Sequence, residues 1–298
     1  IDKARGVGGR SSNKKYKNLI FDHGLQYFSP KTKGFKNFIN SMTRKGVLKK
    51  WDGNHLDFTF KNKNTNEKII GKHGNNDLCK HLLRNIEKRN NIEISLINYK
   101  KKFWILKSKN KFIVSKNIII TFPFFQSKLL AKNYLKNNFL QMNVKMEPNI
   151  TLLISINNNK IIPVSSIKIR DSIISWAANE NSKSRFKAKK NYWTIQASYS
   201  FSKKIINKYK KKRLYYSNLI LKNFLKISGF NMKQIKTLKI HGWKYSYNRK
   251  KTKLKSYWDS KIGLGMCADW FIGPNAECAW LSSKDLYNKI KKNPPKKY

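Results

Sequence analysis

The feature that most constrains this chain is its opening, IDKARGVGGRSS. An apolar residue leads into Asp2, a short basic connection follows, and then come two adjacent glycines, Gly8 and Gly9, and Arg10. Adjacent glycines adopt positive φ at little cost, which lets a backbone approach a pyrophosphate, and arginine donates charge-assisted hydrogen bonds to phosphate. In a dinucleotide-binding βαβ unit, an acid that ends the second strand binds the ribose hydroxyls. The opening therefore predicts an α/β fold that binds a dinucleotide.

Part of such a unit does not occur in this sequence. The Gly-x-Gly-x-x-Gly turn and the first strand, which precede the acid in a complete unit, are missing before Asp2, and the chain opens on Ile1 rather than methionine. We therefore expect an N-terminally truncated piece of a longer protein. Without that turn the pyrophosphate loses a helix N-terminus, so we expect the truncated form to bind the dinucleotide poorly and to be inactive.

The net charge permits two interpretations. Among 298 residues, 65 are Lys or Arg and 15 are Asp or Glu, which gives +50. Such a charge by itself indicates a nucleic acid or an anionic membrane as partner. The other interpretation is codon bias, because Lys, Asn and Ile are over-used together, the lysines are dispersed, and no aromatic spacing resembles a nucleic-acid-binding module. We favour codon bias and keep a basic nucleic-acid-binding protein as an alternative.

Other sequence features narrow the compartment and the chemistry. Three widely spaced cysteines, Cys79, Cys267 and Cys278, fit a reducing compartment, so we expect a cytoplasmic protein without a zinc site. No apolar run approaches the roughly 18 to 20 residues of a membrane span, and we expect no membrane partner. The five histidines are scattered, and we find no catalytic triad, paired carboxylates or metal cluster.

The first part of the chain predicts short strands and one clear helix. Residues 18–30 predict a strand, a glycine turn and an aromatic segment, and residues 35–51 have near-helical apolar spacing followed by a strand start. Residues 56–70 alternate around an Asn/Lys-rich turn, which predicts a hairpin.

A second helix is predicted from Asn76 or Asp77 to about Ile86, with an apolar face made of Leu78, Leu82, Leu83 and Ile86. Three strands follow at 92–97, 103–106 and 112–121. The last ends in a near-continuous apolar run, which is typical of a buried parallel strand.

Residues 124–259 predict a second region built on a sheet. Its strand candidates are 150–156, 173–177 and 193–198, and a lysine-rich helix is predicted from about Ser202 to Ile227. The chain then closes with a strand that delivers Asp269, a short loop, and a helix that begins near Glu277.

A second motif carries a family resemblance. Residues 21–28 have the form Phe-Asp-x-Gly-x-Gln-Tyr-Phe. With the Arg-Gly-x-Gly-Gly-Arg opening, this resembles the renalase-like NAD/FAD-dependent oxidoreductases of the flavin amine-oxidase superfamily. The resemblance implies FAD as cofactor and a first set of FAD-binding residues: Asp2, Lys3, Gly8, Gly9, Arg10, Gly24, Gln26 and Tyr27. The alternative for residues 21–28 is a simple β-turn with a core aromatic.

The C-terminal strand, loop and helix extend the resemblance. In flavoproteins of this fold the acid binds the ribityl or pyrophosphate region, and the helix N-terminus faces the flavin N1/C2=O edge, where reduction places negative charge. The resemblance therefore adds Asp269, Glu277 and Ala279 to the FAD-binding residues. Three family glycines are replaced, by Ala268, Cys278 and Ser283. These replacements keep a second alternative open, a degenerate relative without catalytic activity.

The resemblance also implies a reaction. A hydride passes from a reduced nicotinamide substrate of the NAD(P)H type, or from an amine, to FAD and then to dioxygen, with formation of peroxide. Because the cofactor carries this chemistry, we predict no catalytic side chain. His241 is the only histidine beside a Trp/Tyr group, and it is our substrate-pocket candidate together with Trp176, Trp193 and Gln196.

The resulting fold prediction is an α/β flavoprotein of the glutathione-reductase type. Its FAD-binding domain, without the first βα unit, uses residues 1–30, 75–125 and 258–298. A substrate domain with a mixed β-sheet and helices uses residues 31–74 and 126–257.

Overall fold

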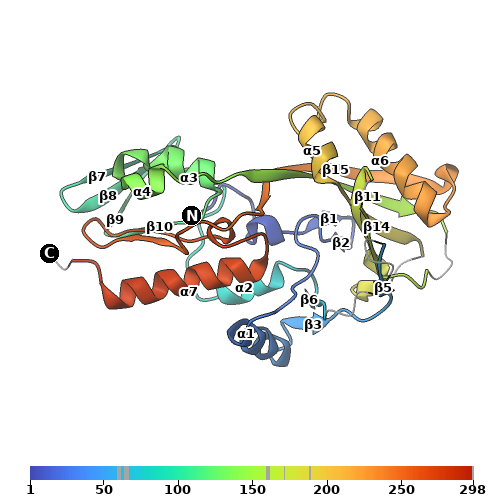
Figure 1. Cartoon of the computed structure of the whole chain (residues 1–298), viewed down its shortest axis with the longest axis horizontal. Helices are drawn as coiled ribbons and strands as arrows, with labels where there is room; N and C mark the ends of the chain where they lie inside the picture. The colour runs from blue at the N-terminus through green and yellow to red at the C-terminus, as the bar shows by residue number, and fades with distance from the viewer. Residues whose placement is uncertain (59–61, 64–66, 159–161, 171, 188, 297–298) are drawn as a thin grey trace. The chain divides into compact units, whose positions relative to one another are not determined.

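A computed structural model describes residues 1–58, 62–63, 67–158, 162–170, 172–187 and 189–296 (Figure 1). The chain divides into two compact units. The first comprises Ile1–Gly6, Ile86–Met146 and Tyr247–Tyr298, and the second comprises Val7–Asn85 and Glu147–Ser246. These bounds differ from those of the domains expected from the sequence, and the assignment of FAD-binding and substrate domains stays a prediction.

The second unit is built on a seven-stranded sheet of order β15-β11-β14-β13-β12-β4-β5. The pairs β11–β14, β14–β13, β13–β12 and β4–β5 are antiparallel, whereas β12 and β4 pair in parallel from Ser166↔His55 to Lys168↔Asp57. The strand bounds are β15 (Ile235–Asn248), β11 (Met146–Ile156), β14 (Asn191–Ala197), β13 (Ile174–Asn179), β12 (Ser166–Lys168), β4 (His55–Asp57) and β5 (Asn62–Lys63).

Alternation along these strands gives the sheet two different faces. Ile150, Leu152 and Ile154 of β11 lie in one core with residues of α5 (Tyr199–Ile205) and α6 (Arg213–Ser228). Figure 1 shows both helices beside β15 and β11. Residues of the intervening positions, such as Thr151 and Thr194, are also buried but polar. One face therefore forms the main apolar core, and the opposite face mixes polar side chains with apolar ones such as Leu153 and Trp176.

Smaller elements complete the second unit. Asp22 directly follows the hairpin of β1 (Lys14–Tyr16) and β2 (Leu19–Phe21), and β3 (Leu48–Lys50) pairs antiparallel with β6 (Ile69–Gly71). Between them α1 (Lys33–Arg44) starts at Thr32, whose hydroxyl accepts a hydrogen bond from the Phe35 amide. The remaining short elements are η1 (Gly9–Ser11), α2 (Asp77–Leu82), η3 (Glu180–Lys183) and η4 (Met232–Gln234).

The first unit contains two three-stranded sheets. The strands β7 (Leu96–Lys100), β8 (Phe103–Lys107) and β9 (Phe112–Ser115) form an antiparallel meander. The second sheet has the order β10-β17-β16, and β10 runs parallel to β17, with Ile118 opposite Leu264. Its strands are β10 (Ile118–Ile120), β17 (Leu264–Met266) and β16 (Tyr257–Asp259). The helices are α3 (Phe124–Ala131), η2 (Lys132–Tyr134), α4 (Asn137–Leu140), η5 (Asp269–Phe271) and α7 (Ala276–Lys292).

Several predicted elements are confirmed. The strand at 18–30, the helix and strand within 35–51, the strands within 150–198 and the parallel strand before Pro123 are all present. The predicted hairpin within 56–70 is confirmed in part: β4 pairs with β5, with Leu56 opposite Lys63, but its predicted last residues belong to β6, which pairs with β3 instead. Residues 59–61 and 64–66 of that prediction lie outside the described part of the chain.

Other predicted elements were wrong in extent. The helix predicted to reach Ile86 ends at Leu82, and Leu82 and Ile86 of its predicted apolar face are exposed, so burial of that face does not extend the helix. The predicted strand 112–121 is two strands, β9 and β10, and Ile119 is exposed rather than buried. The first strand of the meander begins at Leu96 rather than Ile92.

The helix predicted from Ser202 to Ile227 is also interrupted. It is replaced by α5 and α6, and the break falls in the lysine-rich stretch 207–212. Lysines spaced three or four residues apart on a helix repel one another, which disfavours a continuous helix there. None of the helices within the described residues combines the length and the hydropathy needed to cross a bilayer.

Candidate functional site

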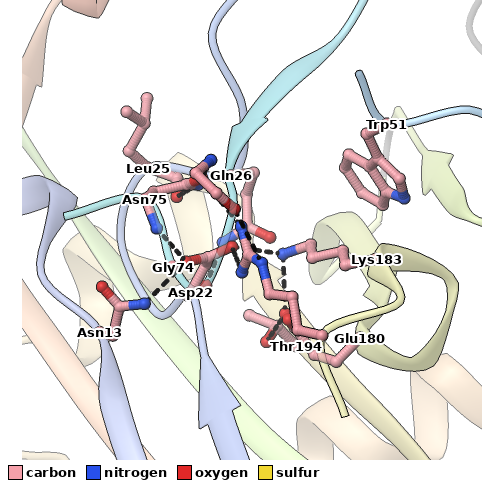
Figure 2. A network of polar contacts seen from close by, with 12 residues as sticks. Asn13, Asp22, Leu25, Gln26, Trp51, Gly74, Asn75, Glu180, Lys183 and Thr194 are labelled. Carbon is pink, nitrogen blue, oxygen red and sulfur yellow. Dashed lines mark hydrogen bonds and ion pairs between the residues drawn. The ribbon is translucent and has the colours of Figure 1, made fainter. Parts of the chain in front are cut away.

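The candidate site is organised around Asp22, which follows β2 and lies fully buried in the second unit (Figure 2). Its Oδ2 accepts hydrogen bonds from Lys183 Nζ at 2.8 Å and from Arg185 Nη1 at 2.5 Å. Its Oδ1 accepts from the Asn75 amide at 3.0 Å and from Asn13 Nδ2 at 3.3 Å. Burial raises the pKa of Asp22, but Lys183 and Arg185 outweigh it and hold that pKa below its usual value. Asp22 is therefore ionised in the folded protein.

A second buried acid, Glu180, shares Lys183 with Asp22. Glu180 Oε1 accepts from Lys183 Nζ at 3.0 Å and from Thr194 Oγ1 at 2.6 Å, whereas Oε2 is buried without a hydrogen-bond partner among the described residues. Burial raises the pKa of Glu180, and the nearby Asp22 charge raises it further against the effect of Lys183. The two acids therefore have pKa values displaced in opposite directions, although they lie on either side of one ammonium group.

Arg185 joins this cluster to the loop after β6. Its Nη2 donates to Asn75 Oδ1 at 3.1 Å and its Nε donates to the Gly71 carbonyl at 3.1 Å. Asn75 Oδ1 also accepts from the Gly71 amide at 3.0 Å. One ionic cluster thus fixes the end of β2, the loop after β6 and the turn after β13.

The backbone after Asp22 is held at four successive carbonyls. Gln26 Nε2 donates to the Asp22 carbonyl at 2.5 Å, and Gln196 Nε2 donates to that of Gly24 at 2.8 Å. Thr151 Oγ1 and Trp243 Nε1 both donate to the His23 carbonyl at 2.9 Å. Asn75 Nδ2 donates to the Leu25 carbonyl at 2.7 Å. Side chains from β11, β14 and β15 therefore position the segment 22–26.

Gly24 packs directly on the glycine-rich opening. A Cβ at this position would lie 2.1 Å from the Arg10 carbonyl oxygen, so only glycine fits without movement. The Leu25 amide donates to the same carbonyl at 2.9 Å. Gly8 and Gly9 have φ of 115° and 49°, in the left-handed region that favours glycine. Arg10 Nη1 donates to the Ser246 carbonyl at 2.6 Å.

An aromatic group lies beside this segment. Tyr27 contacts Trp51 and Trp176, with ring centroids 6.4 Å and 5.4 Å away. The Lys183 ammonium lies 5.0 Å from the Trp51 ring centre, and the ammonium of buried Lys68 lies 5.4 Å from that of Tyr27. Burial lowers the pKa of Lys68 to about 8. Positive groups of the protein itself therefore face two of these rings.

His23 and His241 form a second aromatic group with Trp243. The two imidazole centroids lie 4.9 Å apart, and those of His241 and Trp243 lie 4.6 Å apart. Burial, the nearby His241 and Lys14 lower the pKa of His23 to about 4. Burial together with Lys14, Lys239 and Lys210 lowers the pKa of His241 to about 4. Both imidazoles are neutral at pH 7.

These values predict acid sensitivity. Below pH 6.5 the unfolded chain protonates both histidines, whereas the folded protein does so only near pH 4, so stability is lost as the pH falls between these values. The expected loss is at most about 1.4 kcal/mol per pH unit for each histidine. Urea unfolding at several pH values should show a shallower dependence for His241→Phe than for the wild type.

The same measurement on His73→Phe is the matched control, because His73 is exposed and outside this group. Glu180 also titrates, with the opposite sign, since its raised pKa adds stability as the pH falls. It is present in all three proteins, so only the differences between them count. If the free energy of unfolding depends on pH equally in the wild type and in His241→Phe, the lowered pKa of His241 is contradicted.

Three of the four substrate-pocket candidates lie around the segment 22–27. Gln196 contacts Gly24, His241 contacts His23, and Trp176 contacts Tyr27. Trp193 does not join them, because it points to the other face of the sheet and packs against Phe224 and Phe230 in the apolar core.

The FAD-binding candidates fall into both units. Gly8, Gly9, Arg10, Gly24, Gln26 and Tyr27 belong to the second unit and lie together there. The other candidates, Asp2, Lys3, Asp269, Glu277 and Ala279, belong to the first.

Within the first unit these residues form two groups. The Asp2 amide donates to the Arg89 carbonyl at 2.9 Å, and Lys3 Nζ lies 3.2 Å from Glu93 Oε1. Asp269 and Glu277 are both buried, in η5 and in the first turn of α7. Asn275 accepts a hydrogen bond from the Cys278 amide at 2.9 Å and so caps α7, which confirms the helix start predicted near Glu277.

Sequence reasoning did not assign a role to Asp22, Asn75, Glu180, Lys183 or Arg185. One signal was available, because acids are scarce in this basic chain and Asp22 directly follows an apolar strand. Within the described part of the chain, no group of three or more His, Cys, Asp or Glu residues could hold a metal ion.

Solved structures share this fold at very low sequence identity. A triple mutant of putrescine oxidase matches with a TM-score of 0.67 and 7% identity over 98% of this chain and 93% of that one. A protein provisionally named a protoporphyrinogen oxidase, from Exiguobacterium sp. 255-15, matches with a TM-score of 0.59 and 11% identity over 77% of this chain and 53% of that one. Cyclohexylamine oxidase from Brevibacterium oxydans IH-35A matches with a TM-score of 0.53 and 8% identity over 78% of this chain and 56% of that one. No protein-family model matches the chain.

These comparisons concern the fold. The α/β class predicted from the sequence, with a mixed sheet as in FAD-dependent oxidoreductases, is confirmed. The matched structures include putrescine oxidase and cyclohexylamine oxidase, and the likeness to these proteins is one of architecture. The chain spans about half the length of the Exiguobacterium protein and of cyclohexylamine oxidase.

Proposed function

We propose that the chain is part of an FAD-dependent oxidoreductase of the renalase-like type, which transfers a hydride from a reduced nicotinamide or an amine to FAD and then to dioxygen. One observation carries the proposal. In a chain with this fold, the segment 22–26 is held at four carbonyls and packs through Gly24 on the Gly8-Gly9-Arg10 loop. A backbone fixed in this way is suited to lie beside a planar cofactor, because the protein itself holds its position.

The residues of the second unit fit a flavin dinucleotide. Gly8 and Gly9 provide close backbone approach and Arg10 provides a cationic donor for the pyrophosphate, while Gly24, Gln26 and Tyr27 would line the ring system. The candidates of the first unit, Asp2, Lys3, Asp269, Glu277 and Ala279, stay FAD-binding candidates on the family resemblance alone. When bound, the flavin supplies the hydride-accepting chemistry, and the protein binds and orients both partners.

The charges near Tyr27 favour a reduced nicotinamide over a protonated amine. Aromatic faces attract a substrate ammonium, but Lys68 already lies over Tyr27 and Lys183 over Trp51. A further cation would meet like charges there, whereas an uncharged dihydronicotinamide with anionic phosphates would not. This argument supports the substrate of the NAD(P)H type.

An absorption spectrum tests the cofactor. The protein expressed from its complete reading frame should keep visible flavin bands through desalting, and isomers of reduced nicotinamide should bleach them faster than simple amines do. A colourless protein that also does not bind added FAD would overturn the proposal in favour of the degenerate relative. Binding to oligonucleotides with a steep salt dependence would then support the basic nucleic-acid-binding alternative.

The substitution Gly24→Ala is expected to weaken flavin binding. The added Cβ meets a backbone carbonyl, and overpacking of this kind costs about 1–3 kcal/mol. If displacement of the segment 22–26 relieves the contact, the flavin dissociation constant should rise about tenfold or more in a fluorescence titration. Gly6→Ala is the matched control, because nothing lies within 4 Å of a Cβ there. Equal affinity of the two variants would contradict the placement of flavin beside Gly24.

A further inference from the structure

The strands β7, β8 and β9 of the first unit expose an apolar face. Register and alternation place Leu96, Phe103, Ile105, Phe112 and Val114 on one side of this meander, which we call the outer face. Ile97, Trp104 and Leu106 point to the other side and are buried. Four outer-face residues are large and exposed: Leu96 by 54%, Phe103 by 40%, Phe112 by 69% and Val114 by 62%.

This arrangement departs from the usual pattern. An antiparallel sheet with one solvated face normally alternates apolar residues inward and polar residues outward. Here five of the eight outward positions carry apolar side chains, Asn98, Lys100 and Lys107 occupy the others, and Ile105 lies between its neighbours Asn98 and Val114. Contiguous exposed apolar residues of this kind mark an interaction surface.

The charge around the outer face is of one sign. Both turns of the meander are rich in exposed lysines: Lys100, Lys101 and Lys102 in one, and Lys107, Lys109 and Lys111 in the other. Lys107 Nζ lies 5.8 Å from the centre of the Phe112 ring. The sequence contains no Asp or Glu from residue 94 to residue 146.

We propose that the outer face binds the surface of an anionic lipid bilayer. Apolar side chains inserted at the headgroup boundary, ringed by lysines that attract anionic headgroups, are the two components of peripheral membrane binding. A second copy of the chain fits poorly, because two such faces would bring their lysines together. A nucleic acid fits less well, since only Phe103 and Phe112 offer a ring on which a base could stack, and the remaining apolar residues of the face are aliphatic.

This contact needs no spanning helix. The sequence-based expectation of no membrane partner rested on the lack of a spanning segment, which does not bear on a peripheral contact. The +50 charge, ascribed above to codon bias, would assist such binding through long-range attraction that salt screens.

Sedimentation with vesicles tests the proposal. The wild-type protein should bind vesicles of phosphatidylcholine mixed with phosphatidylglycerol and bind pure phosphatidylcholine weakly. The double variant Phe112→Ser/Val114→Ser should lower partitioning onto the anionic vesicles about tenfold or more. Leu214→Ser/Tyr215→Ser is the matched control and should bind as the wild type does, because these residues are 73% and 57% exposed but lie on α6 of the second unit.

A second measurement separates insertion from charge attraction. Phe112→Trp should show a blue shift of its added emission, taken as the difference from the wild type, when anionic vesicles are present. Equal binding by the Ser double variant, or an indole without a blue shift, would overturn the proposal. Absence of vesicle binding would do the same. If a single-stranded oligonucleotide displaces the vesicles and quenches the added indole, the face binds nucleic acid instead.

Discussion

Replacing Asp22 with asparagine is expected to lower the free energy of unfolding by about 3–5 kcal/mol, as the removal of one partner of a buried ion pair does. The substitution keeps the shape of the side chain but leaves Arg185 and Lys183 with less compensating charge inside the protein. Urea unfolding followed by circular dichroism at neutral pH measures the loss.

Glu180→Gln is the matched control for this prediction. Glu180 is equally buried and contacts the same lysine, but its raised pKa shows that the folded protein disfavours its charge. Neutralising it should therefore cost only about 1 kcal/mol, the scale of an altered hydrogen bond. Equal losses for Asp22→Asn and Glu180→Gln would show that the ion pairs are not the source of the stability.

The pH dependence of Asp22→Asn follows with a defined sign. Because the pKa of Asp22 is lowered in the folded state, its stabilisation is present above about pH 3.8, the unfolded value, and is lost as the pH falls through the folded pKa. The variant lacks this contribution, so the difference in stability between the two proteins should shrink in strong acid.

The sequence predicted well wherever a local pattern decided the structure. The apolar stretches 150–156 and 193–198 form strands as predicted, and Glu277 lies in the first turn of a helix capped by Asn275. Gly24 was singled out for flavin contact by its motif, and the structure shows a packing reason, since Arg10 leaves no room for a Cβ.

What the sequence left open depends on contacts between distant residues. Asp22 lies 161 and 163 positions from Lys183 and Arg185, and no spacing rule links them. Trp176 and Trp193 looked alike as strand tryptophans, but strand pairing sends Trp193 into the helix-covered core and Trp176 beside Tyr27. Which face of a strand meets which neighbour becomes visible only once the sheet is assembled.

Lys183→Met should destabilise the protein by a similar amount, about 3–5 kcal/mol. Its ammonium lies fully buried between Asp22 and Glu180 and faces the Trp51 ring, so its loss leaves two buried carboxyl groups with Arg185 as the remaining cation. Methionine fills a comparable volume, which limits any contribution from a cavity. Lys50→Met is the control, because the Lys50–Asp52 ion pair is exposed and should contribute nothing measurable.

A double-mutant cycle shows where the cost of Lys183→Met arises. If it comes from stranding Glu180 beside Asp22, then Lys183→Met combined with Glu180→Gln should be more stable than the sum of the two single changes by about 0.5–3 kcal/mol. Glu180 would otherwise have to take up a proton, so Lys183→Met alone should also lose stability as the pH rises through the folded pKa of Glu180. Additive losses would instead assign the role of Lys183 to Asp22 alone, and Arg185 could then compensate for part of its loss.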